Sequence, residues 1–212
     1  MTTLLAVHPK TPERRVLGKA ARALRDGALI AFPTDSCYAL GCCPGNKEPM
    51  DRLRSLRGID ERHHLTLMCR DLSEIARYAR VDNVQYRLLK AVTPGSYVFI
   101  LEGTRELPRR LMHPKRKTIG LRVPDHVVAL ALLEELGEPL LTSTLILPEQ
   151  EAPLQDAWAI EEALSGRIEL ILDGGHCGIE PTTVIDLTTD VPELVRQGKG
   201  ALSPFGFAAT GA

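Results

Sequence analysis

The sequence predicts a single α/β domain built on an open, twisted sheet of mixed strand direction and flanked by helices. Segments with a helical spacing of apolar residues alternate with short apolar runs typical of strands along the 212 residues. No low-complexity linker and no repeat period divides the chain. The strands number about seven, which suits an open sheet, because a barrel needs more regular units. We therefore expect one domain over residues 1–212, with a core of about 14–200 and a flexible tail over 204–212.

The chain is expected to begin with a helix followed by a strand. Thr11-Pro12-Glu13 supplies a capping residue, a first-turn proline and an early acid, which predicts a helix up to Gly27. The apolar run A-L-I-A-F then predicts a sheet-core strand that ends at Pro33. Further elements expected in the first half are helices at 50–57, 71–79 and from 82 onward, and a strand at 65–68.

Capping residues place the later helices. Asp71 with Glu74, and Asp82 with Gln85, have the spacing of a capping box. Asp125 is expected to cap a further helix, which Gly137 closes. The remaining elements expected are a turn at 93–95, strands at 97–101, 118–123, 168–172 and 183–187, an apolar segment at 139–141 and a helix around 158–164.

Polar side chains follow the strand that ends at Pro33. The run P-T-D-S-C-Y places Thr34, Asp35, Ser36 and Tyr38 at the carboxyl edge of that strand. In open α/β sheets this edge is where small ligands bind, so the hydroxyl groups are candidates to contact a ligand. The alternative, which composition alone favours, is a turn whose side chains satisfy only their own backbone.

Charge and length exclude several classes of function. With Lys+Arg 26 against Asp+Glu 27, the net charge is −1, so no global attraction draws the chain to nucleic acid or membrane. No apolar run approaches the ~20 residues of a membrane helix, and the N-terminus lacks the regions of a signal peptide, so a cytoplasmic protein is expected. Neither a P-loop nor a dinucleotide-binding glycine motif is present.

The cysteines and histidines do not predict a metal site. The five cysteines are odd in number and lack C-x-x-C spacing, which indicates reduced, mostly buried thiols. Cys37 lies inside the hydroxyl run, so a nucleophilic role is a second, less favoured interpretation. The pair His63-His64 lacks a spaced partner, and surface histidines are expected there.

Positive charge is concentrated in one segment, where Glu106 is the only acid. The basic segment can bind phosphates through its local positive potential, or it can form a solvated loop whose side chains pair with neighbouring acids. Arg122 differs from the rest because it lies within an apolar strand, so its guanidinium should face a carboxylate or a ligand anion. The basic residues are Arg105, Arg109, Arg110, Lys115, Arg116, Lys117 and Arg122.

Six sequence motifs resemble those of the YrdC/YciO family and occur in the same order as in that family. The resemblance extends from about Arg14 to Gly200, and R-D-L-S-E with K-R-K-T-I-G-L-R-V-P brings it nearest to the YciO branch. The motifs are P-T-D-S-C-Y-A-L-G at 33–41, T-P-G-S-Y-V-F-I-L at 93–101, G-L-R-V-P-D-H at 120–126, L-T-S-T at 141–144, P-T-T-V-I-D at 181–186 and V-R-Q-G at 195–198.

The resemblance implies both an architecture and a reaction. It implies one α/β domain whose twisted open sheet surrounds a positively charged cavity. It also implies that ATP, L-threonine and bicarbonate are condensed, with Mg²⁺, to threonylcarbamoyl-adenylate and pyrophosphate, for the N6-threonylcarbamoylation of tRNA. Binding of double-stranded RNA is a further property described in the family. Because adenylation is a displacement at phosphorus, the reaction needs positioned cations rather than a nucleophilic side chain.

The resemblance also carries over site residues, position by position. Arg57 and Arg122 are expected to be catalytic, with Arg122 holding phosphate or carboxylate. The expected contacts to threonine and the nucleotide are Thr34, Ser36, Tyr38, Ser143, Thr182, Thr183 and Arg196. We further expect Arg122→Ala to abolish nucleotide binding with little loss of stability.

Two motifs and one further position depart from the family pattern. The family's K-G-R-P falls on Arg57-Gly58-Ile59-Asp60, and its S-A-N ends on Leu145. Met68 stands where many members carry a histidine. A lost guanidinium and a lost amide each remove a hydrogen bond worth about 1 to 3 kcal/mol. Arg62 and Arg70 are two candidates to compensate.

Two functions are therefore considered. The first is a threonylcarbamoyl-adenylate synthase, with weak or altered activity. The second is a non-catalytic paralogue that binds nucleotide, tRNA or double-stranded RNA, with the basic segment carrying the affinity for RNA.

Overall fold

The computed structural model describes residues 1–207, so the end of the expected tail, 208–212, lies outside the described residues. It contains one mixed ten-stranded sheet with the order β1-β8-β2-β3-β7-β4-β6-β5-β9-β10. The predicted class, a single α/β domain with an open sheet flanked by helices, is confirmed. The strands are β1 Thr3–Ala6, β2 Ile30–Phe32, β3 Ala39–Cys42, β4 Thr66–Met68, β5 Tyr97–Glu102, β6 Thr118–Arg122, β7 Leu140–Thr144, β8 Leu170–Asp173, β9 Thr183–Asp186 and β10 Glu193–Arg196.

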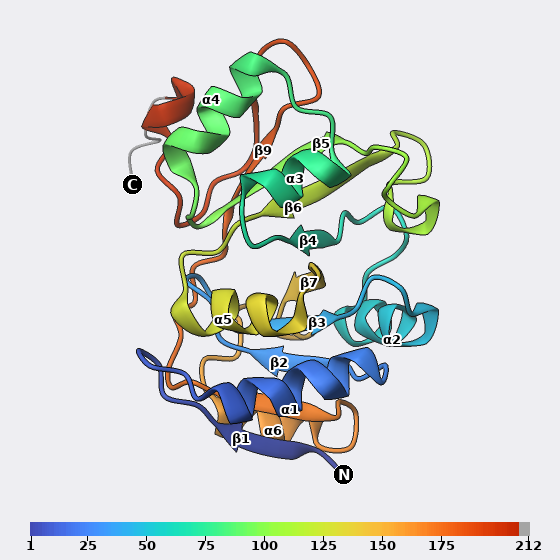
Figure 1. Ribbon diagram of the computed structural model, residues 1–212, viewed down its shortest axis with the longest axis vertical. Helices are drawn as coiled ribbons and strands as arrows, with labels where there is room; N and C mark the ends of the chain where they lie inside the picture. The colour runs from blue at the N-terminus through green and yellow to red at the C-terminus, as the bar shows by residue number, and fades with distance from the viewer. Residues whose placement is uncertain (208–212) are drawn as a thin grey trace.

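Six α-helices and two 3₁₀ turns cover parts of this sheet. Figure 1 shows α1, α2, α5 and α6 along the half that contains β1, β2 and β3, and α3 and α4 along the half that contains β5 and β9. They are α1 Arg14–Arg25, α2 Lys47–Arg57, α3 Leu72–Tyr78, α4 Asn83–Val92, α5 Val127–Leu136 and α6 Ala157–Leu164, with η1 Arg109–Leu111 and η2 Ser203–Phe205.

Alternation along the strands divides the core between the two faces of the sheet. In β2, Ile30 and Phe32 join the cluster beneath α1 and α5, whereas Leu29 and Ala31 join the larger cluster on the opposite face. Both faces of this strand are thus buried, because successive side chains point to opposite sides. This explains why A-L-I-A-F is apolar throughout.

The other half of the sheet is covered on only one side. In β5, Phe99 and Leu101 are buried in the core, whereas Val98 and Ile100 point into a cavity on the other face. The same alternation leaves Gly120 of β6 on the cavity face, since it pairs with Ile100 and with Thr66. The uncovered face of β4, β5, β6 and β9 is therefore available to a ligand.

Of the helix caps predicted for α3, α4 and α5, that of α4 is confirmed, that of α3 is partly correct and that of α5 is wrong. At α4, the capping box of Asp82 with Gln85 is complete. At α3, the side chain of Asp71 caps the helix, but the capping box is not completed, because the Glu74 carboxylate accepts from the backbone amide of Arg70 instead of that of Asp71. Asp125 was predicted to cap α5, but the cap is His126. The ring Nδ1 of His126 accepts a hydrogen bond from the amide of Ala129 at 3.4 Å.

The remaining differences concern segments without a clear pattern. Three strands were not predicted: β1 and β10 at the sheet edges, and β3, which directly follows the polar run after Pro33. The described part of the expected tail, 204–207, is packed rather than frayed, because Phe205 is buried against the rings of Tyr97 and Phe99.

Candidate functional site

A cavity of about 450 Å³ lies on the uncovered face of the sheet. Its lining comes from β4, β5, β7, β9 and β10, together with the end of α2 and the loop that follows it. A narrow inner extension of about 20 Å³ shares part of this lining and reaches the segment after β2. The volume of the outer part lies within the usual range for small-molecule sites.

The floor of the cavity is a row of paired residues across adjacent strands. Thr142, Thr66, Gly120 and Ile100 pair in succession across β7, β4, β6 and β5. A Cβ atom at Gly120 would lie 3.0 Å from Val98 and 3.3 Å from the hydroxyl of Thr66, so a side chain there would crowd the floor. The glycine therefore contributes directly to the depth of the cavity.

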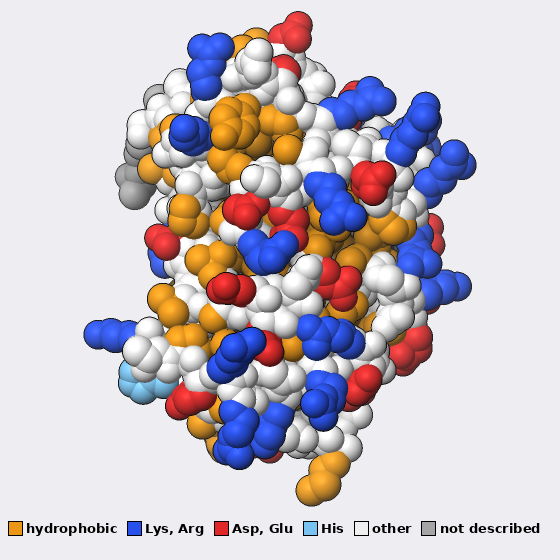
Figure 2. All heavy atoms as spheres, in the orientation of Figure 1, with side chains coloured by type: hydrophobic (Ala, Val, Ile, Leu, Met, Phe, Trp, Pro, Cys, Tyr) orange, Lys and Arg blue, Asp and Glu red, His pale blue; other side chains and the backbone are white. Residues whose placement is uncertain are grey.

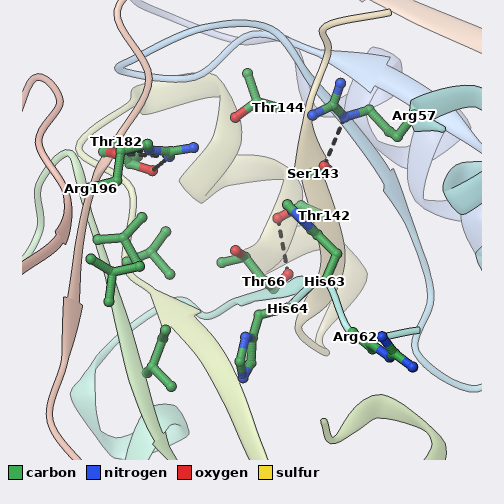
Figure 3. A pocket seen from close by; sticks show the side chains of 14 residues that line it. Arg57, Arg62, His63, His64, Thr66, Thr142, Ser143, Thr144, Thr182 and Arg196 are labelled. Atoms are coloured by element: carbon green, nitrogen blue, oxygen red, sulfur yellow. Dashed lines mark hydrogen bonds between the residues drawn. The ribbon is translucent and has the colours of Figure 1, made fainter. Parts of the chain in front are cut away.

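Three arginines give the cavity its charge. In Figure 3, Arg57 lies across the pocket from Arg196, and Arg62 projects from the loop after α2. None of the cavity-lining residues, all within the described chain, carries a carboxylate. Burial and the nearby guanidinium of Arg196 lower the pKa of Arg57 to about 10. Unneutralised cations facing each other are stabilised by a bound anion.

Local backbone structure positions Arg57 at the cavity rim. It is the last residue of α2, which ends at Gly58 in the left-handed conformation with φ 62°. The Nε–H of Arg57 donates to the hydroxyl of Ser143 at 3.1 Å. The two predicted site residues are thereby brought together, and the rest of the guanidinium points toward the pocket.

Arg196 is held by the segment that precedes β9. Its Nη2 donates to the carbonyl of Thr182 at 2.9 Å and to the hydroxyl of Thr182 at 3.3 Å. Both residues line the cavity, as predicted for them. Thr183 does not line it: its side chain is fully buried, donates to the carbonyl of Gly200 at 2.7 Å and accepts from the amide of Gly198 at 3.0 Å. Thr183 therefore holds this segment in place.

The hydroxyl run after β2 has a mixed role. Thr34 donates to the carbonyl of Cys37 at 2.6 Å and accepts from the amide of Ser36, so it organises its own turn. The Ser36 hydroxyl lies 3.1 Å from that of Thr34, and both residues line the inner extension. Tyr38 is fully buried, and its hydroxyl donates to the carbonyl of Gly175 at 2.8 Å. The self-satisfied turn is therefore present, while the role of Thr34 and Ser36 at a ligand edge stays a prediction.

Arg122 and Asp35 form a buried ion pair beside the inner extension. Their side chains are 6% and 7% exposed, and Asp35 also accepts from the hydroxyl of Ser96 at 2.6 Å. Lys199 donates to the backbone carbonyl of Asp35. Among the described residues, the buried Nε–H of Arg122 is the only buried side-chain polar atom without a partner. The carboxylate expected for Arg122 is therefore Asp35, and one donor remains for a ligand.

His63 and His64 were expected on the surface: His63 is exposed, as expected, and also lines the open cavity, whereas His64 is half-buried and lines the same cavity. Burial, with smaller effects of His113 and Arg116, lowers the pKa of His64 to about 4. Its imidazole is therefore neutral at pH 7, and its Nε2 lies 2.8 Å from the hydroxyl of Thr118. Adjacent histidines carry no signal in the sequence, because only the tertiary fold places them on the cavity wall.

Arg62 and Arg70 were the two candidates to replace the family arginine that is absent at Ile59, and they lie in different places. Ile59 packs against the core, and Leu145 is fully buried. Arg62 lines the cavity, whereas Arg70 pairs with Glu74 at 3.1 Å, away from it. Arg62 is therefore the only one of the two candidates within reach of a ligand.

The cysteines were examined in the sequence as thiols and as metal ligands, and the structure shows their surroundings. All five cysteines are free and buried, as expected. Burial and the neighbouring Cys177 raise the pKa of Cys37 to about 11, so its thiol stays protonated and the nucleophilic interpretation loses support. Within residues 1–207, no group of three metal-ligating side chains is clustered. No helix in that range is long and apolar enough to cross a membrane.

The fold and site define a class of α/β proteins with a cationic, hydroxyl-lined cavity on an open sheet, and comparisons with known proteins identify the family. A family model described as Sua5_yciO_yrdC, telomere recombination, matches residues 22–198. The chain belongs to this Sua5/YciO/YrdC family.

Relatives of two kinds were found. YciO of Escherichia coli is 49% identical, with 97% of this chain and 100% of that chain covered, and its crystal structure superposes with a TM-score of 0.94. The mouse threonylcarbamoyl-AMP synthase is 30% identical, over 93% of this chain and 71% of its own length. The crystal structure of Pyrococcus abyssi Sua5 complexed with L-threonine is 28% identical and has a TM-score of 0.85, with 93% and 58% covered.

Proposed function

We propose that the cavity binds ATP, L-threonine and bicarbonate and condenses them to threonylcarbamoyl-adenylate, with release of pyrophosphate. The observation that carries this proposal is the cluster of Arg57, Arg62 and Arg196 in a cavity without a lining carboxylate. A triphosphate is a ligand whose charge such a site can neutralise. The threonylcarbamoyl-AMP synthase from mouse and the threonine complex of Sua5 support the choice of reaction.

The proposed chemistry divides into two steps. The amino group of threonine first takes up bicarbonate to form a carbamate and water. A carbamate oxygen then attacks the α-phosphorus, a new P–O bond forms, and the bond to the β-phosphate oxygen breaks to release pyrophosphate. The arginines neutralise the negative charge that repels the attacking carboxylate, and they hold the leaving group in line. No side chain of the protein needs to act as a nucleophile.

The residues present suggest how the substrates are distributed. Arg122, whose Nε–H is unpaired, and Ser36 line the narrow inner extension, where they can contact one polar end of the amino acid while the rest of it occupies the outer cavity. The outer cavity with Arg57, Arg62 and Arg196 suits the phosphates. Mg²⁺ is proposed to enter on the nucleotide, held by phosphate oxygens, because the lining offers only hydroxyl and imidazole groups as further ligands. It would draw negative charge from the phosphates in the same way as the guanidinium groups.

A second candidate function is binding without turnover. It is favoured by Ile59 and Leu145, which pack into the core at positions where the family pattern carries an arginine and an asparagine. A paralogue of this kind would retain nucleotide or RNA binding, including tRNA or double-stranded RNA, and would lose catalysis. Release of pyrophosphate distinguishes the two functions.

The test is pyrophosphate release with ATP, Mg²⁺, bicarbonate and L-threonine, compared with the same mixture without threonine. We expect threonine-dependent release by the wild-type protein. Arg62→Gln should slow it by about tenfold, which corresponds to one charge-assisted hydrogen bond. The matched control Arg70→Gln should not, because Arg70 pairs with Glu74 outside the cavity. ATP binding with no release at high protein concentration would favour the second function.

A further inference from the structure

A second hollow, of about 700 Å³, lies beside the segment that joins β5 to β6. Figure 2 shows Lys and Arg side chains gathered over this part of the molecule. The hollow is separate from the candidate site: His113 lines it, His64 lines the other cavity, and the two rings stack with their centroids 4.9 Å apart.

The structure divides the seven basic residues of the segment into two groups. Arg110 donates to the carbonyls of Pro44 and Gly45, Arg116 lies 3.7 Å from the carboxylate of Asp186, and Arg122 pairs with Asp35. The side chains of Arg105, Arg109, Lys115 and Lys117 have no ion pair or hydrogen bond within residues 1–207. Of these four, all except Lys115 line the hollow.

The hollow is cationic and partly apolar at its base. Arg80 completes its charged lining, with Glu102 3.6 Å away on its outer side, and no carboxylate belongs to the lining itself. Leu107 and Met112 form the apolar base, and a Cβ at Gly103 would lie 2.9 Å from Met112, so the glycine keeps that base open. Four cations around an open apolar base match an anionic ligand with an organic part.

The loop that presents Lys117 is rigidly built. The Nδ1 atom of His113 accepts from the amides of Lys115 and Arg116, at 3.3 and 3.1 Å, and Lys117 donates its own amide to the carbonyl of His113. Lys117 adopts φ 56°, the only positive φ of a non-glycine residue in the described chain. This conformation is costly for a residue with a side chain, and such outliers concentrate at binding sites.

We propose that this hollow is a second anion site, which binds a small polyphosphorylated molecule. A compact ligand fits better than a nucleic acid, because a nucleic-acid backbone needs a continuous track of free cations. Here the flanking Arg110 and Arg116 are engaged by acceptors of the protein itself, so of the segment's free cations only Lys115 lies outside the hollow and no continuous track is formed. The proposal does not depend on the activity of the first cavity.

The test is calorimetric titration with sodium tripolyphosphate as the probe. We expect two classes of site in the wild-type protein. Arg105→Gln with Lys117→Gly should weaken one class at least tenfold, and Arg57→Gln with Arg196→Ala should weaken the other. Arg109→Gln alone is a milder second variant of the hollow. Loss of both classes in the first double variant, or of neither, would overturn the assignment.

Controls separate a specific site from general charge. Arg15→Gln with Lys19→Gln removes two exposed cations from α1, far from the hollow, and should leave both classes unchanged. An equal loss of tripolyphosphate binding in this control would overturn the proposal. So would the finding that duplex RNA binding requires Arg105 and Lys117 whereas tripolyphosphate binding does not. If binding to the hollow survives in Arg57→Gln with Arg196→Ala while ATP binding is lost, the two sites are independent.

Discussion

A single buried ion pair links the candidate site to the stability of the fold. Arg122 and Asp35 are almost fully enclosed, and they are 87 residues apart in the sequence. The sequence predicted that Arg122 needs an anion, because it lies in an apolar strand. It could not predict that the anion is Asp35, because that contact depends on how β6 meets the segment after β2.

This pair changes the expected effect of replacing Arg122. Arg122→Met should destabilise the protein by about 3 to 5 kcal/mol, because it leaves the Asp35 carboxylate buried and unpaired. The earlier expectation of little loss is therefore revised. Arg122→Met with Asp35→Asn should regain most of that stability but not the binding of L-threonine. Urea unfolding measures the first effect and calorimetry the second; a cost below about 1 kcal/mol for the single variant would contradict the account.

At the scale of elements, two chain segments close the site. The turn before β9 and the segment after β10 are joined by Thr183, whose hydroxyl bonds both Gly198 and Gly200. β9 was predicted as a strand over 183–187, whereas β10 was not predicted, because all four of its residues are exposed. Its strand conformation comes from pairing with β9, a tertiary effect that local sequence does not carry.

Thr183→Val tests the role of this junction. The substitution keeps the shape and removes the hydroxyl, which leaves a buried carbonyl and amide unsatisfied and should cost about 1 to 3 kcal/mol of unfolding free energy. Nucleotide binding should weaken as well, because Arg196 and Thr182 belong to the same junction. Thr189→Val, which alters an exposed threonine, is the control and should change little. Equal effects of the two substitutions would mean that the hydroxyl of Thr183 has no special role.

At the scale of the whole molecule, the curvature of the sheet creates the site. Residues from β7 and β10, five places apart in the strand order, line one cavity. Strand patterns predicted most of the members of this sheet. They could not predict its curvature, and so they gave no indication that His63 and His64 line the cavity.

The histidines with lowered pKa values predict how stability depends on pH. The pKa of His64 falls from 6.5 to about 4 on folding, and burial lowers those of His63 and His126 as well. Between these values the unfolded chain binds more protons than the folded one, so stability should decrease as the pH is lowered from 6.5 toward 4. His64→Gln should reduce that decrease between pH 7 and 5, whereas His176→Gln, at an exposed site, should not. Urea midpoints at the two pH values provide the measurement.

The central claim is that the arginine-lined cavity holds a triphosphate beside L-threonine, and calorimetry tests it most directly. ATP with Mg²⁺ is titrated into the protein, with and without L-threonine, and the titration is repeated with Arg57→Gln and Arg196→Ala. We predict one ATP per chain, tighter binding when threonine is present, and at least tenfold weaker binding in each variant. Absence of ATP binding, or binding that neither substitution weakens, would contradict the account.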